Sequence, residues 1–201
     1  MAAIYTATRS GAGFDLLSPN PAAIDFDEIA MTLAFINRFN GAFEKPVSVA
    51  QHTLIAVECA PFSLKPWVAL HDAHEYVLGD WTRPAVAAVS HIANGIAAES
   101  GAAFRIALDQ LRQSHDAAIH EAAGLPMPTP QQAVDILKFD NIALATERRD
   151  FLARPRFRWG AIDHVQPAPR RYGFLPPDVV GTKLAQLFRT LLPSLSDRSP
   201  R

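Results

Sequence analysis

The stretch that decides the fold runs from Leu70 to Asp80 and reads Leu-His-Asp-Ala-His-Glu-Tyr-Val-Leu-Gly-Asp. It places three carboxylates and two imidazoles among apolar neighbours. On a helix, His71 and Glu75 would lie one turn apart on the same side, and Gly79 would end the helix. Buried ionisable groups are costly unless they are paired or bind a metal ion. The stretch therefore predicts a helix that carries a buried polar site.

The composition sets broad limits on the protein. The chain has 201 residues and a net charge of −1, so we expect one substantial helical domain and no general attraction to nucleic acid or membrane surfaces. Its single cysteine, Cys59, cannot form an intramolecular disulfide and fits a reducing compartment. The N-terminus lacks the apolar core of a secretory signal, and no run approaches the roughly eighteen apolar residues of a membrane span. We therefore expect a cytoplasmic protein.

Helical periodicity runs through most of the chain, and no strand alternation of any length is present. Apolar residues recur at helical spacing from Phe26 to Ile36, in a helix expected to end near Asn40-Gly41. The segment after Ser48 is apolar on nearly every side, as in a central helix. The expected class is all-α. The expected divisions are an irregular N-terminal arm at 1–24, a helical core at 25–152, a C-terminal loop and helix packed on the core at 153–193, and a disordered tail at 194–201.

Polar residues interrupt the apolar faces of three different predicted helices. They are His52, the adjacent pair His71-Asp72, and Asp140. A lone buried histidine or aspartate is more often an ordinary hydrogen-bonded core residue than a ligand. Two imidazoles and two carboxylates together suit a divalent transition metal that keeps open positions for water and substrate. The set therefore favours a metal site.

The ordered pattern His … His-Asp … Asp resembles that of the HD-domain metal-dependent phosphohydrolases. The resemblance covers roughly residues 25–152. Within the family, the chain is similar to the branch of the bacterial 5′-deoxynucleotidases and the phage enzymes that hydrolyse dATP. The motifs that carry it are Arg38-Phe39, Ser48–His52, His71–Glu75, Gly79-Asp80 and Asp140–Glu147. The resemblance implies an HD-domain helical bundle with a central site for a divalent ion (Mn, Co, Zn, Fe, Ni or Mg). His52, His71, Asp72 and Asp140 would be the ligands.

The same resemblance implies roles for residues around the metal. Glu75 and Asp80 would be catalytic carboxylates, and the substrate-binding residues would be Arg38, Phe39, Thr82 and Arg83. The deoxynucleotidase carries a tryptophan where this chain has Phe39. Relatives often carry a lysine after the position of Pro84, and Arg83, Arg148 and Arg149 remain alternative substitutes for it. A homo-oligomer, either a dimer or a larger assembly, is also expected from the resemblance.

The expected activity is hydrolysis of nucleotides by attack of a metal-activated water on phosphorus. Deoxynucleoside mono- and triphosphates are the expected substrates, and the choice between them stays open. One alternative is a phosphodiesterase or a hydrolase of a signalling nucleotide. Another is a non-catalytic HD module that binds nucleotides; the presence of both Glu75 and Asp80 counts against it. A guanidinium such as that of Arg38 suits phosphate because its planar fork matches phosphate oxygens.

Overall fold

The computed structural model describes residues 3–153, 157–160 and 162–196, and this part of the chain is mostly helical. The all-α class expected from the sequence is confirmed. The elements are β1 (Tyr5–Ala7), β2 (Gly13–Asp15), α1 (Phe26–Leu33), α2 (Val49–Cys59), α3 (Lys65–Leu70), α4 (Glu75–Leu78), α5 (Arg83–Ile96), α6 (Ser100–Ala123), α7 (Pro130–Asp150), α8 (Pro177–Leu191) and α9 (Pro193–Ser196), with short 3-10 turns at Pro21–Ala23, Arg38–Gly41 and Phe62–Leu64.

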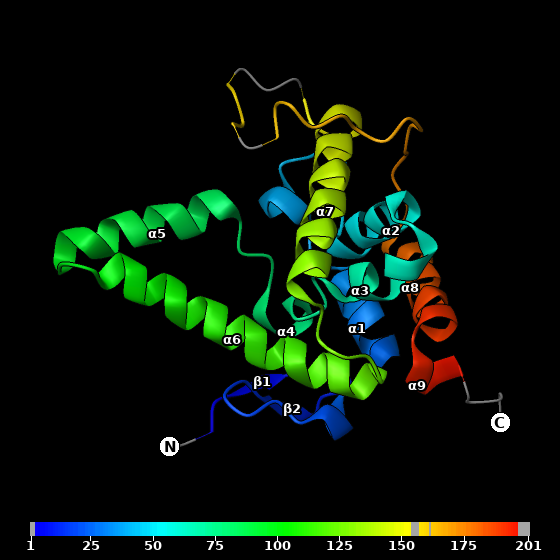
Figure 1. The fold of residues 1–201 in the computed structure, drawn as a ribbon, viewed down its shortest axis with the longest axis horizontal. Coiled ribbons are helices and arrows are strands. Elements are labelled where there is room, and N and C mark those ends of the chain that lie inside the picture. Colours follow the sequence, from blue (N-terminus) through cyan, green and yellow to red (C-terminus); the bar gives the residue numbers. More distant parts are fainter. Residues whose placement is uncertain (1–2, 154–156, 161, 197–201) are drawn as a thin grey trace.

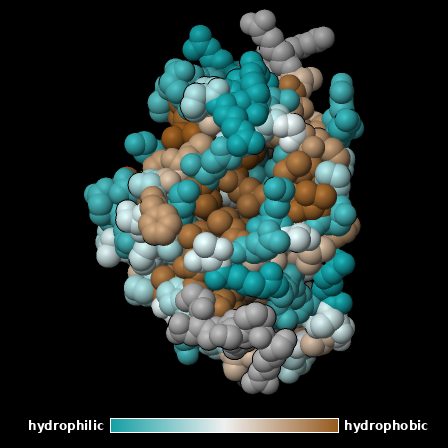
Figure 2. All heavy atoms as spheres, turned by 90° about the vertical axis from the view of Figure 1, so that its right-hand side faces the viewer, coloured by the Kyte–Doolittle hydropathy of each residue, from teal (hydrophilic) through white to brown (hydrophobic). Residues whose placement is uncertain are grey.

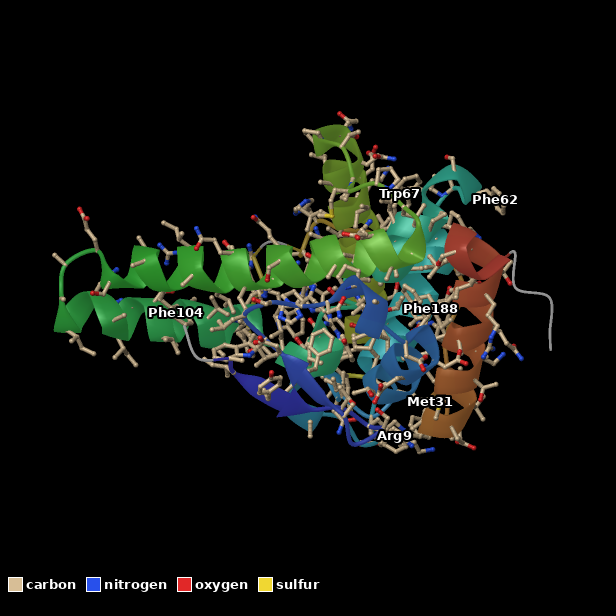
Figure 3. The ribbon with its side chains drawn as sticks, turned by 90° about the horizontal axis from the view of Figure 1, so that it is seen from below. Arg9, Met31, Phe62, Trp67, Phe104 and Phe188 are labelled. Carbon is tan, nitrogen blue, oxygen red and sulfur yellow. The ribbon has the colours of Figure 1, made fainter. Side chains whose placement is uncertain are left out.

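The body of the protein is built around α2, most of whose residues are buried. Helices α7, α3 and α8 pack against it, and α1 packs along α8 (Figure 1). Phe188 of α8 is fully buried and meets Phe26 of α1 edge to face, with ring centroids 5.7 Å apart (Figure 3). The prediction that the segment after Ser48 forms a central helix is confirmed, because an all-apolar helix must be covered on every side.

Helices α5 and α6 form a hairpin that projects from the body (Figure 1). Ser90 is the only buried residue of α5, and this helix packs mainly against α6, while Arg83 at its start reaches Asp140 of α7. Gly101, near the start of α6, allows the close approach of the two helices. A Cβ at Gly101 would lie 2.1 Å from the Ser90 carbonyl oxygen, well inside the contact distance.

Gly101→Ala is expected to push α5 and α6 apart and to lower the free energy of unfolding by about 1–3 kcal/mol, since overpacking at a backbone contact cannot be relieved by a rotamer change. The matched control is Gly95→Ala on α5, where an added Cβ meets nothing within 4 Å. That control should stabilise the helix slightly, by up to about 1 kcal/mol. Thermal unfolding and amide hydrogen exchange of α5 measure both. Equal behaviour of the two variants would contradict the prediction.

The N-terminal arm is more regular than the sequence suggested. Strands β1 and β2 pair antiparallel with Thr6 opposite Phe14, so the expectation of no strand is wrong for this segment. Each strand has three residues, which is too short for an alternating pattern to be visible. Phe14 is buried and packs against Tyr76 and His115, each with ring centroids 5.8 Å away. The arm is therefore attached to α4 and α6.

Two predicted helix boundaries differ from the observed ones. The helix expected to carry the whole Leu70–Asp80 stretch is interrupted, because α3 ends at Leu70 and α4 begins at Glu75, with a turn between them. The Glu75 N–H bonds to the Asp72 carbonyl three residues back rather than four, which marks this tighter turn. Helix α1 ends at Leu33, earlier than expected. Gly79 does end α4, with a φ of 77° that favours glycine.

The C-terminal helix α8 packs on α1, and the short α9 follows it. The disordered tail predicted for 194–201 does not hold for residues 194–196, because Pro193–Ser196 form α9. The remainder of that tail, 197–201, lies outside the described residues. Figure 2 shows apolar side chains gathered in the middle of the face on which α8 lies, with hydrophilic side chains around them. Among the described helices, none has the length and apolar character needed to cross a membrane.

Candidate metal centre

Helix α2 carries His52 into the middle of the protein. Ser48 caps the helix by accepting a hydrogen bond from the Gln51 N–H at 3.2 Å. The helices around α2 leave His52 fully buried. A buried imidazole needs partners for its ring nitrogens, and Nδ1 has one in the Glu147 carboxylate of α7, 3.0 Å away.

His71 reaches the same place from the turn after α3. Its Nδ1 lies 2.7 Å from the Val68 carbonyl oxygen, which can only accept a hydrogen bond, so Nδ1 carries the proton. The Glu147 carboxylate likewise accepts from Nδ1 of His52. The two Nε2 atoms then face each other at 3.3 Å. Two facing lone pairs repel unless a cation lies between them, and this orientation of imidazoles is typical of metal ligation.

Two aspartates border the facing nitrogens. Asp72 Oδ2 lies 3.1 Å from His71 Nε2 and 3.6 Å from His52 Nε2. Asp140 Oδ1 lies 3.2 Å from His52 Nε2. We refer to His52, His71, Asp72 and Asp140 as the His–Asp cluster. Ligand atoms of the first three all lie within 4.8 Å of one another, so they could hold a metal ion. The structure thus brings together the four residues that the sequence singled out.

Without a metal ion, protons supply the positive charge of the cluster. Burial and the nearby Arg38 lower the pKa of His52, but Glu147 and Asp140 outweigh them and raise it to about 10. Burial also lowers the pKa of His71, and Asp72 more than offsets this, so the net direction is upward. Burial opposes ionisation of Asp72, yet His71 and His52 hold its pKa well below the usual range. The cluster therefore favours a bound cation.

Glu75 and Asp80 lie near the His–Asp cluster without being part of it. Burial, followed by repulsion from Asp72 and Asp80, raises the pKa of Glu75 to about 10. The Glu75 Oε2 atom is buried and has no hydrogen-bond partner among the described residues. Burial also raises the pKa of Asp80, although Arg38 opposes this shift. A carboxyl group such as that of Glu75, which holds its proton at neutral pH beside a cationic site, is suited to general acid–base chemistry.

Arg38 lies in the middle of three carboxylates. Its Nη1 is 3.4 Å from Asp80 Oδ2 and 3.9 Å from Asp72 Oδ2, and its Nε is 3.6 Å from Glu147 Oε2. The Arg38 N–H bonds to the Val47 carbonyl at 2.8 Å, and Asn37 and Ser48 form an antiparallel bridge, so the chain turns and returns antiparallel. Because the chain turns back here, the Arg38 guanidinium lies beside Asp72, one of the predicted metal ligands.

Phe39 follows Arg38 in a backbone conformation that is rare for a large side chain. Its φ is 53°, in the left-handed region, and the next residue, Asn40, shares that conformation. Such strain costs on the order of 1–3 kcal/mol per residue and tends to occur at functional sites. The Arg38 Cζ atom lies 5.6 Å from the centroid of the Phe39 ring, close enough for a cation–π contact.

The structure gives Thr82 and Arg83 partners within the protein. The Thr82 hydroxyl caps α5 by accepting from the Ala85 N–H at 3.4 Å. Arg83 donates to Asp140 Oδ2 at 2.8 Å and to Asn141 Oδ1 at 3.3 Å, while its side chain is 58% exposed. Arg83 is therefore close to the cluster and reachable from solvent. His74, whose role the sequence left open, is bonded to Asp116 of α6 at 2.9 Å.

Glu147 is a candidate site residue to which the sequence assigned no role. It lies seven residues after Asp140 on α7, which places both on one face two turns apart, and this spacing is the signal that could have revealed it. It is fully buried and orients His52 through Nδ1. A carboxylate that accepts from the outer nitrogen of a ligating histidine raises the affinity of that histidine for metal.

Glu147→Gln is expected to weaken metal binding by about 10- to 100-fold, because an amide orients the His52 ring less strongly than a carboxylate does. Isothermal titration of the chelator-treated protein with Zn²⁺ or Mn²⁺ measures the affinity. Glu58→Gln, at a surface ion pair with Arg170, is the matched control and should leave it unchanged. Metal affinity that is equal in parent and Glu147→Gln protein would remove Glu147 from the site.

The protonation of the cluster predicts how the stability of the metal-free protein depends on pH. Folded His52 holds its proton up to a pKa of about 10, whereas an unfolded histidine loses it near 6.5, so its contribution is complete below 6.5 and is lost as pH rises toward 10. Glu75, protonated up to a pKa of about 10 when folded but ionised above 4.5 when unfolded, acts in the same direction.

The Tm of chelated protein should therefore fall between about pH 6 and about pH 9. Saturating metal should remove this fall, because deprotonated ligands bind metal more tightly and the bound ion stabilises the native state. Scanning calorimetry with chelator or with metal measures both curves. A chelated Tm that stays level or rises over this range would contradict the protonation of the cluster.

Comparison with known proteins found no protein-family model that matches the chain. The chain is 42% identical over 89 residues to an uncharacterized protein of Rhodobacter capsulatus, an alignment that covers 40% of this chain and 45% of that relative. The chain therefore matches less than half the length of that relative. It is also 29% identical over 176 residues to the uncharacterized protein YfdR of Escherichia coli K12, covering 86% of this chain and 85% of YfdR. The likeness to YfdR thus extends over the whole candidate site.

Proposed function

We propose that this protein is a metal-dependent phosphohydrolase of the HD type that acts on nucleotides. The observation that carries the proposal is the pair of facing Nε2 atoms of His52 and His71, 3.3 Å apart, with each Nδ1 atom beside an acceptor oxygen on the outer side of its ring. Ordinary core histidines have no reason to turn both inner nitrogens toward each other beside two aspartates, an arrangement in which a metal ion or an added proton must lie between the rings. The donor set of imidazole and carboxylate fits a divalent transition metal.

The His–Asp cluster would hold that ion. When bound, a divalent metal supplies Lewis acidity, which makes water nucleophilic near neutral pH and offsets the charge of phosphoryl oxygens. His52 is oriented by Glu147, and His71 by the Val68 carbonyl, so neither ring has to reorganise on binding.

Residues around the cluster would transfer protons and bind the phosphate. Glu75 Oε2, buried and without a partner among the described residues, can hold or deliver a proton beside the cluster. Asp80 and Arg38 form a pair at 3.4 Å that can change partners when a phosphate arrives. The ion pairs of Arg38 use Nε and Nη1, which leaves its Nη2 amino group for a phosphate oxygen. Arg83, half exposed beside Asp140, is a second cation within reach of the site.

Turnover measurements test the proposal. The protein, loaded in turn with Mn²⁺, Co²⁺, Zn²⁺, Fe²⁺, Ni²⁺ and Mg²⁺, is given deoxy- and ribonucleotides as mono- and triphosphates. We expect metal-dependent release of phosphate from monophosphates or of a longer phosphate from triphosphates, with deoxynucleotides preferred. Asp72→Asn should lose both the metal and the activity. Stoichiometric metal binding without release of phosphate from any of these nucleotides would overturn the proposal.

A further inference from the structure

Trp159 lies in the segment between α7 and α8 and packs against Phe39. The two ring centroids are 5.5 Å apart, with the planes tilted by 44°, and neither residue is fully buried. Phe39 in turn lies beside Arg38, whose Nη1 is 3.4 Å from Asp80. One guanidinium therefore separates the Phe39–Trp159 pair from the acidic residues of the site.

Trp159 is held in place by the helix that also serves the His–Asp cluster. Asp163 accepts hydrogen bonds from the N–H groups of Trp159 and Gly160, at 3.3 and 3.2 Å. It also accepts from Nη1 of Arg148 at 2.6 Å, and the Arg148 Cζ atom lies 5.1 Å from the Trp159 ring centroid. Arg148 directly follows Glu147 on α7. The same turn of α7 thus fixes both the orientation of His52 and the position of the indole.

The indole N–H of Trp159 has no acceptor in the described part of the chain, although the Nε1 atom is buried. A buried indole N–H normally finds a hydrogen-bond partner. The other indole contacts follow this rule: the N–H of Trp67 bonds to the Pro126 carbonyl at 3.0 Å and that of Trp81 to the Leu78 carbonyl at 3.1 Å. The donor of Trp159 is buried beside the site and unsatisfied among the described residues, so a ligand would supply its acceptor by displacing side chains that cover the indole, among them Phe157 and Arg148.

We propose that Trp159 is a specificity-determining residue that binds the nucleobase of the substrate, stacking with Phe39 and donating its indole N–H to an oxygen or nitrogen on the edge of the base. The inference rests on the proposed function, because it names the part of the nucleotide that this surface takes. The order along the site is the His–Asp cluster, then Arg38, then the Phe39–Trp159 pair. This order matches a nucleotide whose phosphate lies at the cluster and Arg38 and whose base lies at the Phe39–Trp159 pair. Stacking on aromatic rings accepts any base, whereas a single directed donor discriminates among base edges.

Two substitutions separate stacking from hydrogen bonding. Trp159→Ala should raise KM for nucleotides roughly 10- to 100-fold, since it removes the stacking surface. It should leave kcat/KM for deoxyribose 5-phosphate unchanged, because that substrate has no base. Trp159→Phe keeps a ring without the donor, so it should alter the ranking among the bases more than the overall rate. Trp67→Phe, which removes an indole whose N–H is already satisfied (Trp67 is labelled in Figure 3), is the matched control and should change neither.

Binding without turnover separates this inference from the proposed function. In a Trp67→Phe, Trp81→Phe protein, Trp159 is the remaining indole and its fluorescence should be quenched by a deoxynucleoside that carries no phosphate. Quenching in a protein that hydrolyses no nucleotide would retain the inference and overturn the proposed function. Normal nucleotide hydrolysis with an unchanged KM in Trp159→Ala would overturn the inference alone. Absence of both quenching and hydrolysis would overturn both.

Discussion

Glu75→Gln is expected to lower nucleotide turnover by roughly 10²- to 10⁴-fold, the usual effect of removing a general acid–base group. The change is nearly isosteric, so the buried space around Glu75 stays filled. Burial, together with Asp72 and Asp80, raises the pKa of Glu75 to about 10, so its carboxyl group can hold a proton beside the cluster. The amide of glutamine has no acidic proton to donate and is too weak a base to accept one at neutral pH. Metal content should match that of the parent protein.

Steady-state kinetics and metal analysis on the same samples measure the effect. Glu121→Gln makes the same chemical change on the exposed surface of α6 and should leave turnover unchanged. A Glu75→Gln protein that keeps its metal and turns over at the parental rate would exclude Glu75 from the chemistry. Loss of metal together with activity would instead make Glu75 a ligand.

Arg38→Ala is expected to lower both turnover and stability. Its guanidinium lies within 4 Å of Asp72, Asp80 and Glu147, and burial leaves these carboxylates little access to water. Removing one partner of a buried ion pair costs about 3–5 kcal/mol, because the opposite charge stays behind. The effect on unfolding should therefore be largest in the metal-free protein, where no bound ion replaces the lost charge. The family resemblance implies only a substrate-binding role for Arg38, whereas the ion pairs of the structure predict that Arg38 also stabilises the fold.

Denaturant unfolding with and without metal tests this expectation. Arg189→Ala is the matched control, since Arg189 pairs with Asp27 on the surface where both side chains are more than half exposed, and it should change stability by about 1 kcal/mol or less. Arg38→Lys should recover part of the stability but less of the turnover, because an ammonium lacks the planar fork. Equal stability of Arg38→Ala and Arg189→Ala in the metal-free protein would show that Arg38 does not hold the carboxylates together.

The sequence by itself determined the class of the fold and the identity of the cluster. Helical spacing of apolar residues is a local property, so it identified the central helix after Ser48, and a glycine is a local stop signal, so it identified the helix end at Gly79. Polar residues on apolar faces are equally visible in one dimension. His52, His71, Asp72 and Asp140 stood out for that reason, because burying such groups is costly unless something compensates them.

Other features depended on contacts between distant segments and were decided only by the tertiary structure. The hairpin of β1 and β2 is too short to show a pattern, and its stability comes from Phe14 packing on Tyr76 and His115. The break in the helix between Leu70 and Glu75 is likewise invisible to periodicity, because the same residues also fit an unbroken helix.

The partners of the site residues belong to this second group. Glu147 and Trp159 are ordinary in the sequence, and their roles arise because α7 lies against α2 and because Asp163 and Arg148 fix the later loop. A one-dimensional pattern records which residues are costly to bury. Only the packing of helices determines which charge or ring offsets that cost, since hydrogen bonds and ion pairs act over a few ångströms between residues that can be a hundred positions apart.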